Sequence, residues 1–266
     1  MSNASSKKKN IESRIENTEV IPNSSRKADL GGPVRIVLIA FLIFILSQFA
    51  ALVLVEIFLR AFRPENQAGI DLSAGAQFAY ILLAEVMVVG SVFWLLRRRK
   101  LGLGFIGFGR KIKWSDIGWA IAGFFSFYGL LLLATFILVL LIPSFDTDAP
   151  QDVGFNFLST PLDQLIAFVA LVILPPLGEE TLMRGYLFSG LRAKFRFWPA
   201  AIVTSLLFGA AHLSSGVIGA LWAAGVSTFI LSMVLVALRE KTAALYAPIM
   251  LHGLNNTVAF FAHFHS

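Results

Sequence analysis

Long apolar runs are the sequence feature that most constrains how this chain can fold. Seven stretches of the 266 residues are apolar and long enough, or nearly so, to cross a bilayer. Backbone in lipid must satisfy its own hydrogen bonds, and a helix does so within one segment. The sequence therefore predicts an all-α fold, a polytopic membrane bundle of about seven transmembrane helices. The expected spans are Val37–Leu59, Ala76–Leu96, Ile117–Ile142, Leu162–Leu191, Pro199–His212, Val217–Leu238 and Ala244–Phe261.

The expected spans differ in regularity and divide the chain into three parts. The fourth is interrupted at Pro175-Pro176, and the fifth is short for a crossing. Residues 1–33 are polar and are expected to form a disordered cytoplasmic tail. Residues 34–160 then hold the N-terminal transmembrane helices, and residues 161–266 hold the part of the bundle that carries the candidate chemistry.

The net charge of +6 reflects membrane topology rather than nucleic-acid binding. Basic residues cluster beside the apolar runs, and with seven crossings these clusters share one side of the membrane. We therefore expect a multi-pass protein of the plasma membrane, with a cytoplasmic N-terminus, an external C-terminus and no nucleic-acid partner. The absence of Cys excludes disulfides, thiolate metal sites and a Cys nucleophile. The clusters are the N-terminal tail, Arg97–Lys100 with Arg110, Lys111 and Lys113, then Arg192, Lys194 and Arg196, and finally Arg239 and Lys241.

The loop Gly102–Gly107 formally matches a dinucleotide-binding fingerprint, Gly-x-Gly-x-x-Gly. That motif binds a dinucleotide only between a strand and a helix of a βαβ unit. Here it follows a membrane helix and three arginines. We interpret it as a turn at the membrane interface.

Three of the expected spans carry ionisable groups at similar depth. Glu179 lies thirteen residues before Arg192, His212 sixteen after Arg196, and His252 eleven after Lys241. At 1.5 Å per residue these separations correspond to roughly 20, 24 and 16 Å from the cytoplasmic side. Charged and polar groups at that depth are costly and indicate function. We therefore expect one site, whereas His263 and His265 near the C-terminus are expected to be solvated.

The adjacent carboxylates Glu179 and Glu180 are expected to have different roles. In a helix Glu180 and Arg184 are an (i, i+4) pair suited to an ion pair, whereas Glu179 is rotated by about 100°. Asn256 lies one turn after His252 and points the same way, but Asn255 does not. Pro175 and Pro176 leave backbone polar groups of the fourth span without helical hydrogen bonds. Such groups need a protein-lined or wet environment.

These groups suit hydrolysis of an acyl bond without a covalent intermediate. A carboxylate and an imidazole can activate water as a general base. A second imidazole and a carboxamide can stabilise an oxyanion. No Gly-x-Ser-x-Gly motif is present to supply a prepared serine.

Three motifs together resemble the CPBP family, the CAAX proteases and bacteriocin-processing enzymes, also called the Abi family. They are Glu179-Glu180-x-x-x-Arg184, Phe208-x-x-x-His212 and His252-x-x-x-Asn256, in the family's order on successive helices. The resemblance implies an intramembrane glutamate endopeptidase. It implies that Glu179 and His212 activate water, that His252 and Asn256 stabilise the oxyanion, and that Glu180, Arg184 and Phe208 support the site.

The resemblance implies no cofactor, a lipid bilayer as surroundings and a membrane-associated substrate. That substrate could be a prenylated CAAX tail, a leader peptide or a segment of a membrane protein. Two alternatives remain open. Two His and two Glu could ligate zinc in a membrane metallohydrolase. Intramembrane Glu, His and Arg would also suit a non-enzymatic scaffold, an immunity protein or a proton-coupled transporter.

Overall fold

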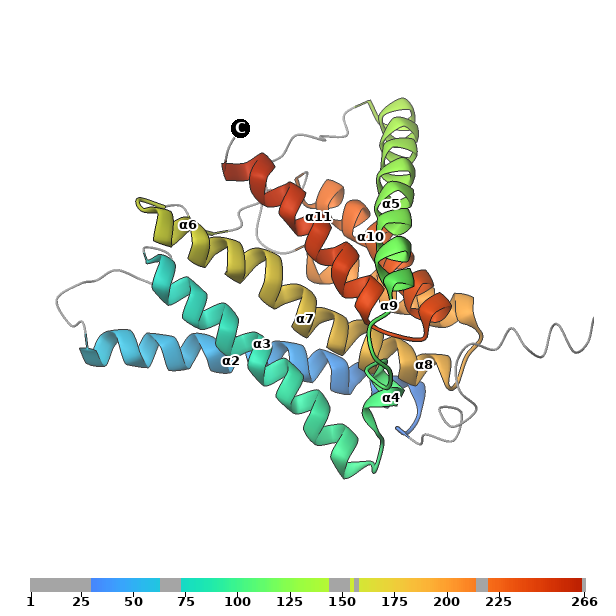
Figure 1. Ribbon diagram of the computed structural model, residues 1–266, viewed down its shortest axis with the longest axis horizontal. Coiled ribbons are helices and arrows are strands. Elements are labelled where there is room, and N and C mark those ends of the chain that lie inside the picture. The colour runs from blue at the N-terminus through green and yellow to red at the C-terminus, as the bar shows by residue number, and fades with distance from the viewer. Residues whose placement is uncertain (1–29, 63–72, 144–153, 156–157, 214–219, 265–266) are drawn as a thin grey trace, which may run out of the picture.

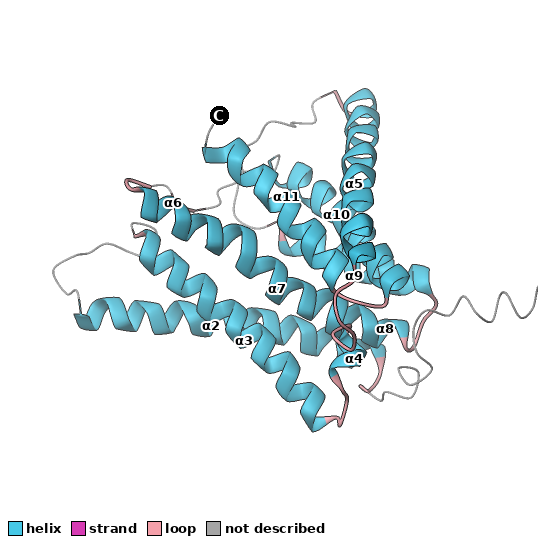
Figure 2. Ribbon diagram, viewed as in Figure 1, coloured by secondary structure: helices cyan, strands magenta, loops and turns pink. Residues whose placement is uncertain are grey.

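A computed structural model describes residues 30–62, 73–143, 154–155, 158–213 and 220–264. Within these ranges the chain consists of helices and loops, without a strand (Figure 2). The all-α fold class is therefore confirmed. The N-terminal tail as far as residue 29 and His265 lie outside the described residues.

Seven helical rods in the described residues correspond to the seven expected spans. They are α2 (Pro33–Phe62), α3 (Ala74–Arg98), α5 (Trp114–Leu141), a composite rod from Pro161 to Arg192, α9 (Phe197–Ala211), α10 (Ala220–Thr242) and α11 (Tyr246–Phe264). Five of them are long and apolar enough to cross a membrane: α2, α3, α5, the composite rod and Trp222–Thr242 within α10. The α9 helix is shorter, as its sequence indicates, and α11 carries several polar side chains.

The composite rod contains two segments wound as π-helices. Its successive parts are α6 (Pro161–Phe168), η3 (Val169–Ile173), α7 (Leu174–Glu180), η4 (Thr181–Phe188) and α8 (Ser189–Arg192). The interruption expected at Pro175-Pro176 takes the form of η3, which ends just before the prolines, and the rod continues beyond them. Its start is fixed by a capping box, in which Thr160 and Asp163 bond each other's backbone N–H.

The composite rod lies between α3 and α11 at the centre of the molecule (Figure 1). On one side α2 packs on α3, and on the other α5 packs on α10 and α11. The α5 helix leaves large apolar side chains such as Phe125, Leu132 and Leu140 exposed, as expected of a surface that faces lipid. Polar side chains of the central rod are thereby shielded from lipid on both sides.

The Gly102–Gly107 loop is a turn, as expected, and its place at the membrane interface stays a prediction. It contains the short helix α4 (Leu103–Ile106), and Gly107 ends that helix at φ +97°, a conformation that favours glycine. The Gly107 carbonyl accepts a hydrogen bond from the Leu245 amide at 3.2 Å. The turn therefore anchors the junction between α10 and α11 rather than a phosphate.

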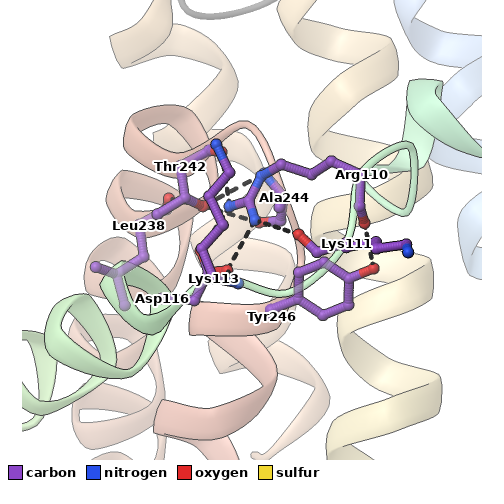
Figure 3. Close-up of polar contacts among 8 residues, drawn as sticks. All are labelled: Arg110, Lys111, Lys113, Asp116, Leu238, Thr242, Ala244 and Tyr246. Atoms are coloured by element: carbon purple, nitrogen blue, oxygen red, sulfur yellow. Dashed lines mark hydrogen bonds and ion pairs between the residues drawn. The ribbon is translucent and has the colours of Figure 1, made fainter.

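A polar cluster holds the start of α5 against the same α10–α11 junction (Figure 3). Arg110 donates two hydrogen bonds to the buried carboxylate of Asp116 and a third, at 3.2 Å, to the Thr242 carbonyl. The Tyr246 hydroxyl donates to the Arg110 carbonyl at 2.6 Å. The hydrogen bonds that Arg110 donates to Asp116 raise the pKa of the Arg110 guanidinium, so this cation stays charged near neutral pH. The cluster fixes the first residue of α11, the helix that carries His252.

We predict that Asp116→Asn destabilises this junction by about 2 kcal/mol, because Arg110 loses a charged, bidentate partner. Thermal unfolding of purified protein, followed by Trp fluorescence, measures the effect. Glu56→Gln is the matched control, since Glu56 pairs with Arg60, whose side chain is 83% exposed. Its effect should be below about 0.5 kcal/mol. Equal melting temperatures for the two variants would contradict the assigned role of the cluster.

Candidate active site

The double proline leaves one carbonyl of the central rod without its usual partners. An α-helical bond to the Leu171 carbonyl would come from residue 175 and a π-helical bond from residue 176, and both are prolines without an N–H. Asn256 Nδ2 donates to this carbonyl at 3.0 Å. Gly253 lets α11 approach, since a Cβ there would lie 3.4 Å from the Val172 carbonyl oxygen. The freed backbone is therefore satisfied by α11.

Glu180 and Arg184 form the ion pair expected from their spacing. Arg184 Nη1 donates to Glu180 Oε1 at 2.9 Å, and neither side chain is exposed. The same carboxylate oxygen contacts His252 Nδ1 at 2.9 Å. A carboxylate that binds Arg184 is ionised and only accepts, so Nδ1 of His252 carries the proton. Glu180 therefore orients His252 as well as neutralising Arg184.

Glu179 differs from Glu180 in both exposure and bonding. Its side chain is 22% exposed, and Oε2 has no hydrogen-bond partner among the described residues. This oxygen lies 3.9 Å from His252 Nε2, too far for a direct hydrogen bond. Glu179 is thus the carboxylate that can meet a reacting molecule, and it faces one of the two histidines, as the helix geometry indicates.

Phe208 packs among the other members of the site. The Arg184 guanidinium carbon lies 4.4 Å from the Phe208 ring centroid, a cation–π contact. The Phe208 centroid lies 4.7 Å from the His212 ring and 5.9 Å from the His252 ring. One buried aromatic side chain therefore separates and positions the two imidazoles and the buried cation.

His212 lies at the C-terminal end of α9 and is partly exposed. Its Nδ1 contacts the Phe208 carbonyl oxygen at 2.9 Å. A carbonyl only accepts, so Nδ1 carries the proton and a neutral His212 presents the lone pair of Nε2. That nitrogen can act as a base. His263, in contrast, is exposed and contacts Phe264, apart from these residues.

The bond to Glu180 also limits what His252 can do. With Nδ1 donating to Glu180, neutral His252 presents Nε2 as an acceptor, and Nε2 donates only in the imidazolium form. Sequence spacing did not reveal this bond, because Glu180 and His252 lie 72 residues apart. An oxyanion role for His252 therefore requires its protonated form.

A further carboxylate, Glu85 of α3, lies beside this site and was not predicted from the sequence. It is buried, and its carboxyl group lies against Gly178, the residue before Glu179. The sequence feature that could have revealed Glu85 is the position of this carboxylate near the middle of the second apolar run. In the described part of the chain, no three His, Asp or Glu side chains are arranged to hold a metal ion.

We predict that Arg184→Ala lowers the stability of the folded protein by about 3–5 kcal/mol, because it leaves Glu180 buried and unpaired. The yield of monodisperse protein in detergent and its melting temperature measure the loss. Arg192→Ala is the matched control, since its pair with Glu240 is about a quarter exposed on each side. Wild-type stability and activity of Arg184→Ala would show that the ion pair is not needed.

Comparison with known proteins finds matches to the part of the chain that holds these residues. A family model described as Rce1-like, type II CAAX prenyl endopeptidase, matches residues 161–258. An uncharacterized 24.3 kDa protein of Escherichia coli is 32% identical over 92 residues, which cover 34% of this chain and 41% of that protein. No solved structure matches the chain. Residues 161–258 thus match a model of the Rce1-like family of CAAX prenyl endopeptidases, and the resemblance inferred from the three motifs is confirmed over that part of the chain.

Proposed function

We propose that this protein is an intramembrane endopeptidase that hydrolyses a peptide bond with water activated by Glu179 and His212. The observation that best supports this function is the contrast between the two adjacent glutamates. Glu180 is fully buried and bonded to Arg184 and His252, whereas Glu179 is partly exposed beside His252 Nε2. Such a division leaves one carboxylate free for chemistry and uses the other to hold the site.

In the proposed reaction Glu179 takes a proton from water while the water oxygen bonds to the scissile carbonyl carbon. The carbonyl electron pair moves to oxygen, and protonated His252 with Asn256 stabilises that oxyanion. Collapse breaks the C–N bond, and the proton held by Glu179 passes to the leaving amine. His212 Nε2, a lone-pair nitrogen, helps to orient the attacking water.

Asn256 would serve two purposes in this scheme. One N–H of its amide caps the Leu171 carbonyl, and the second remains available to an oxyanion. The backbone bond fixes the amide before substrate binds. A fixed donor loses little energy to reorganisation during the reaction, which is the property that oxyanion stabilisation requires.

The proposed substrate is a membrane-associated peptide, either a prenylated CAAX tail or the leader of a secreted peptide. The family description favours the CAAX tail. Basic clusters beside the apolar runs favour a cytoplasmic N-terminus, with the substrate entering from that side or laterally from lipid. We place the protein in the plasma membrane on the same grounds.

We predict that Glu179→Gln lowers cleavage by at least about 10²–10⁴-fold, because the general base is lost. The assay follows an internally quenched, farnesylated CAAX peptide with purified protein in lipid vesicles. His212→Ala and His252→Ala should also be inactive while remaining in the membrane. The membrane peptidomes of cells that carry wild type and Glu179→Gln test leader peptides and other substrates in parallel.

Two results would contradict this assignment. Full retention of the biological effect by folded Glu179→Gln would favour a scaffold, immunity protein or transporter. Complete loss of wild-type activity in excess chelator, restored by zinc, would favour a metallohydrolase. We expect activity to persist in chelator, because Glu179 acts on water directly in the proposed reaction.

We predict that Asn256→Ala lowers kcat by about 10²–10³-fold, the usual effect of removing one oxyanion donor. Asn255→Ala is the matched control, because Asn255 lies on a different face of α11 and accepts from the Tyr128 hydroxyl at 3.4 Å. Its kcat should stay within a few-fold of wild type. Equal losses in the two variants would indicate a general defect of α11 rather than loss of a donor.

A further inference from the structure

Glu85 is a buried carboxylate that the proposed reaction does not use. It lies near the middle of α3 and is 8% exposed. The α3 helix packs directly on α7, which carries Glu179. A Cβ added at Gly178 would lie 2.8 Å from Glu85 Cδ and would overlap Oε2. The absence of a side chain at residue 178 is therefore what admits the Glu85 carboxyl group to this position.

No cation neutralises Glu85 in the described part of the chain. The cation of the site, Arg184, binds Glu180 and stacks on Phe208. On α3 itself Tyr80 interacts with Glu85 electrostatically, but its hydroxyl donates to Gln48 at 2.6 Å. The remaining charged neighbour is Glu179, which has the same sign. Glu179 has His252 Nε2 at 3.9 Å, whereas an ionised Glu85 would have no cation beside it among the described residues and would be repelled by Glu179.

The hydrogen-bonding pattern points to the same conclusion. Glu85 Oε2 and Glu179 Oε2 are both buried atoms without a hydrogen-bond partner among the described residues. Ionised carboxylates only accept, so neither could satisfy the other if both were charged. A proton added to either carboxyl group would turn it into a hydrogen-bond donor. Buried polar atoms usually have such a partner.

We propose that Glu85 is a positioning residue that holds a proton and shares it with Glu179. The Glu85 carboxylic acid donates to Glu179 Oε2, which fixes the Glu179 side chain and leaves its other oxygen, Oε1, to take a proton from water. No net proton is consumed, since the proton on Glu85 stays there through the reaction. Glu85 acts through Glu179 and does not touch the substrate.

Infrared difference spectroscopy tests the shared proton without any substrate, using purified protein in lipid vesicles at neutral pH. We expect a carboxylic acid C=O band that disappears in Glu85→Gln and is unchanged in the control Glu56→Gln. In Glu179→Gln the band should shift in frequency, because the acceptor becomes a neutral amide. An unchanged spectrum in Glu85→Gln, or a band insensitive to Glu179→Gln, overturns the proposal.

Cleavage of the farnesylated CAAX peptide tests the effect on catalysis, which depends on the proposed endopeptidase function. Glu85→Gln keeps an N–H donor and should retain kcat within about tenfold, whereas Glu85→Leu should lose about 10- to 100-fold. The KM should not change in either variant. Equal kcat values for the Gln and Leu variants, both folded, contradict the proposal.

A second pair of variants leaves both carboxyl groups intact. Gly178→Ala should displace Glu85, shift the infrared band and lower kcat. Gly90→Ala, on the same helix as Glu85 and with open space at its Cβ, should do neither. The experiments distinguish failure of the endopeptidase proposal from failure of the shared-proton proposal. An active Glu179→Gln variant rejects the endopeptidase mechanism. An infrared spectrum that is unchanged in Glu85→Gln rejects the shared proton, whatever the activity.

Discussion

The buried ion pair between Glu180 and Arg184 is the interaction on which the rest of the site depends. An unpaired charge at this depth would cost several kcal/mol, so neither residue could be there alone. Glu180 then binds His252 through the same oxygen, and Phe208 covers the Arg184 guanidinium. One ion pair therefore fixes groups from three separate helical rods: the central rod, α9 and α11.

The double proline gives the central rod a second link to α11. Prolines at residues 175 and 176 free the Leu171 carbonyl, and Asn256 binds it. The two links lie on opposite sides of the prolines along the rod, and both end on the same face of α11, at His252 and Asn256. Relative rotation or sliding of the two helices would break both bonds. The backbone defect thus aligns the histidine and the carboxamide to which the proposed reaction assigns the oxyanion.

Much of this arrangement was predictable because its causes are local in sequence. The positions of the helical rods follow from apolar runs, and the Glu180–Arg184 pair follows from the (i, i+4) spacing of any helix. The role of Pro175 and Pro176 was predictable only in part. The loss of two backbone N–H groups predicts carbonyls without a helical partner. It does not predict that η3 forms or that Asn256 is the donor. The N-terminal tail, the orientation and the three-part division of the chain remain predictions.

By itself the sequence determined the fold class and the match of residues 161–258 to a family model, and it predicts a similar depth for Glu179, His212 and His252. Periodicity and hydropathy are properties of a single segment, so the sequence shows them without knowledge of the tertiary contacts. Only the tertiary structure decided that Glu180 orients His252, and that Glu85 approaches the site at Gly178. Those contacts join residues far apart in sequence. Their existence depends on how helices rotate and pack against one another, which no single segment specifies.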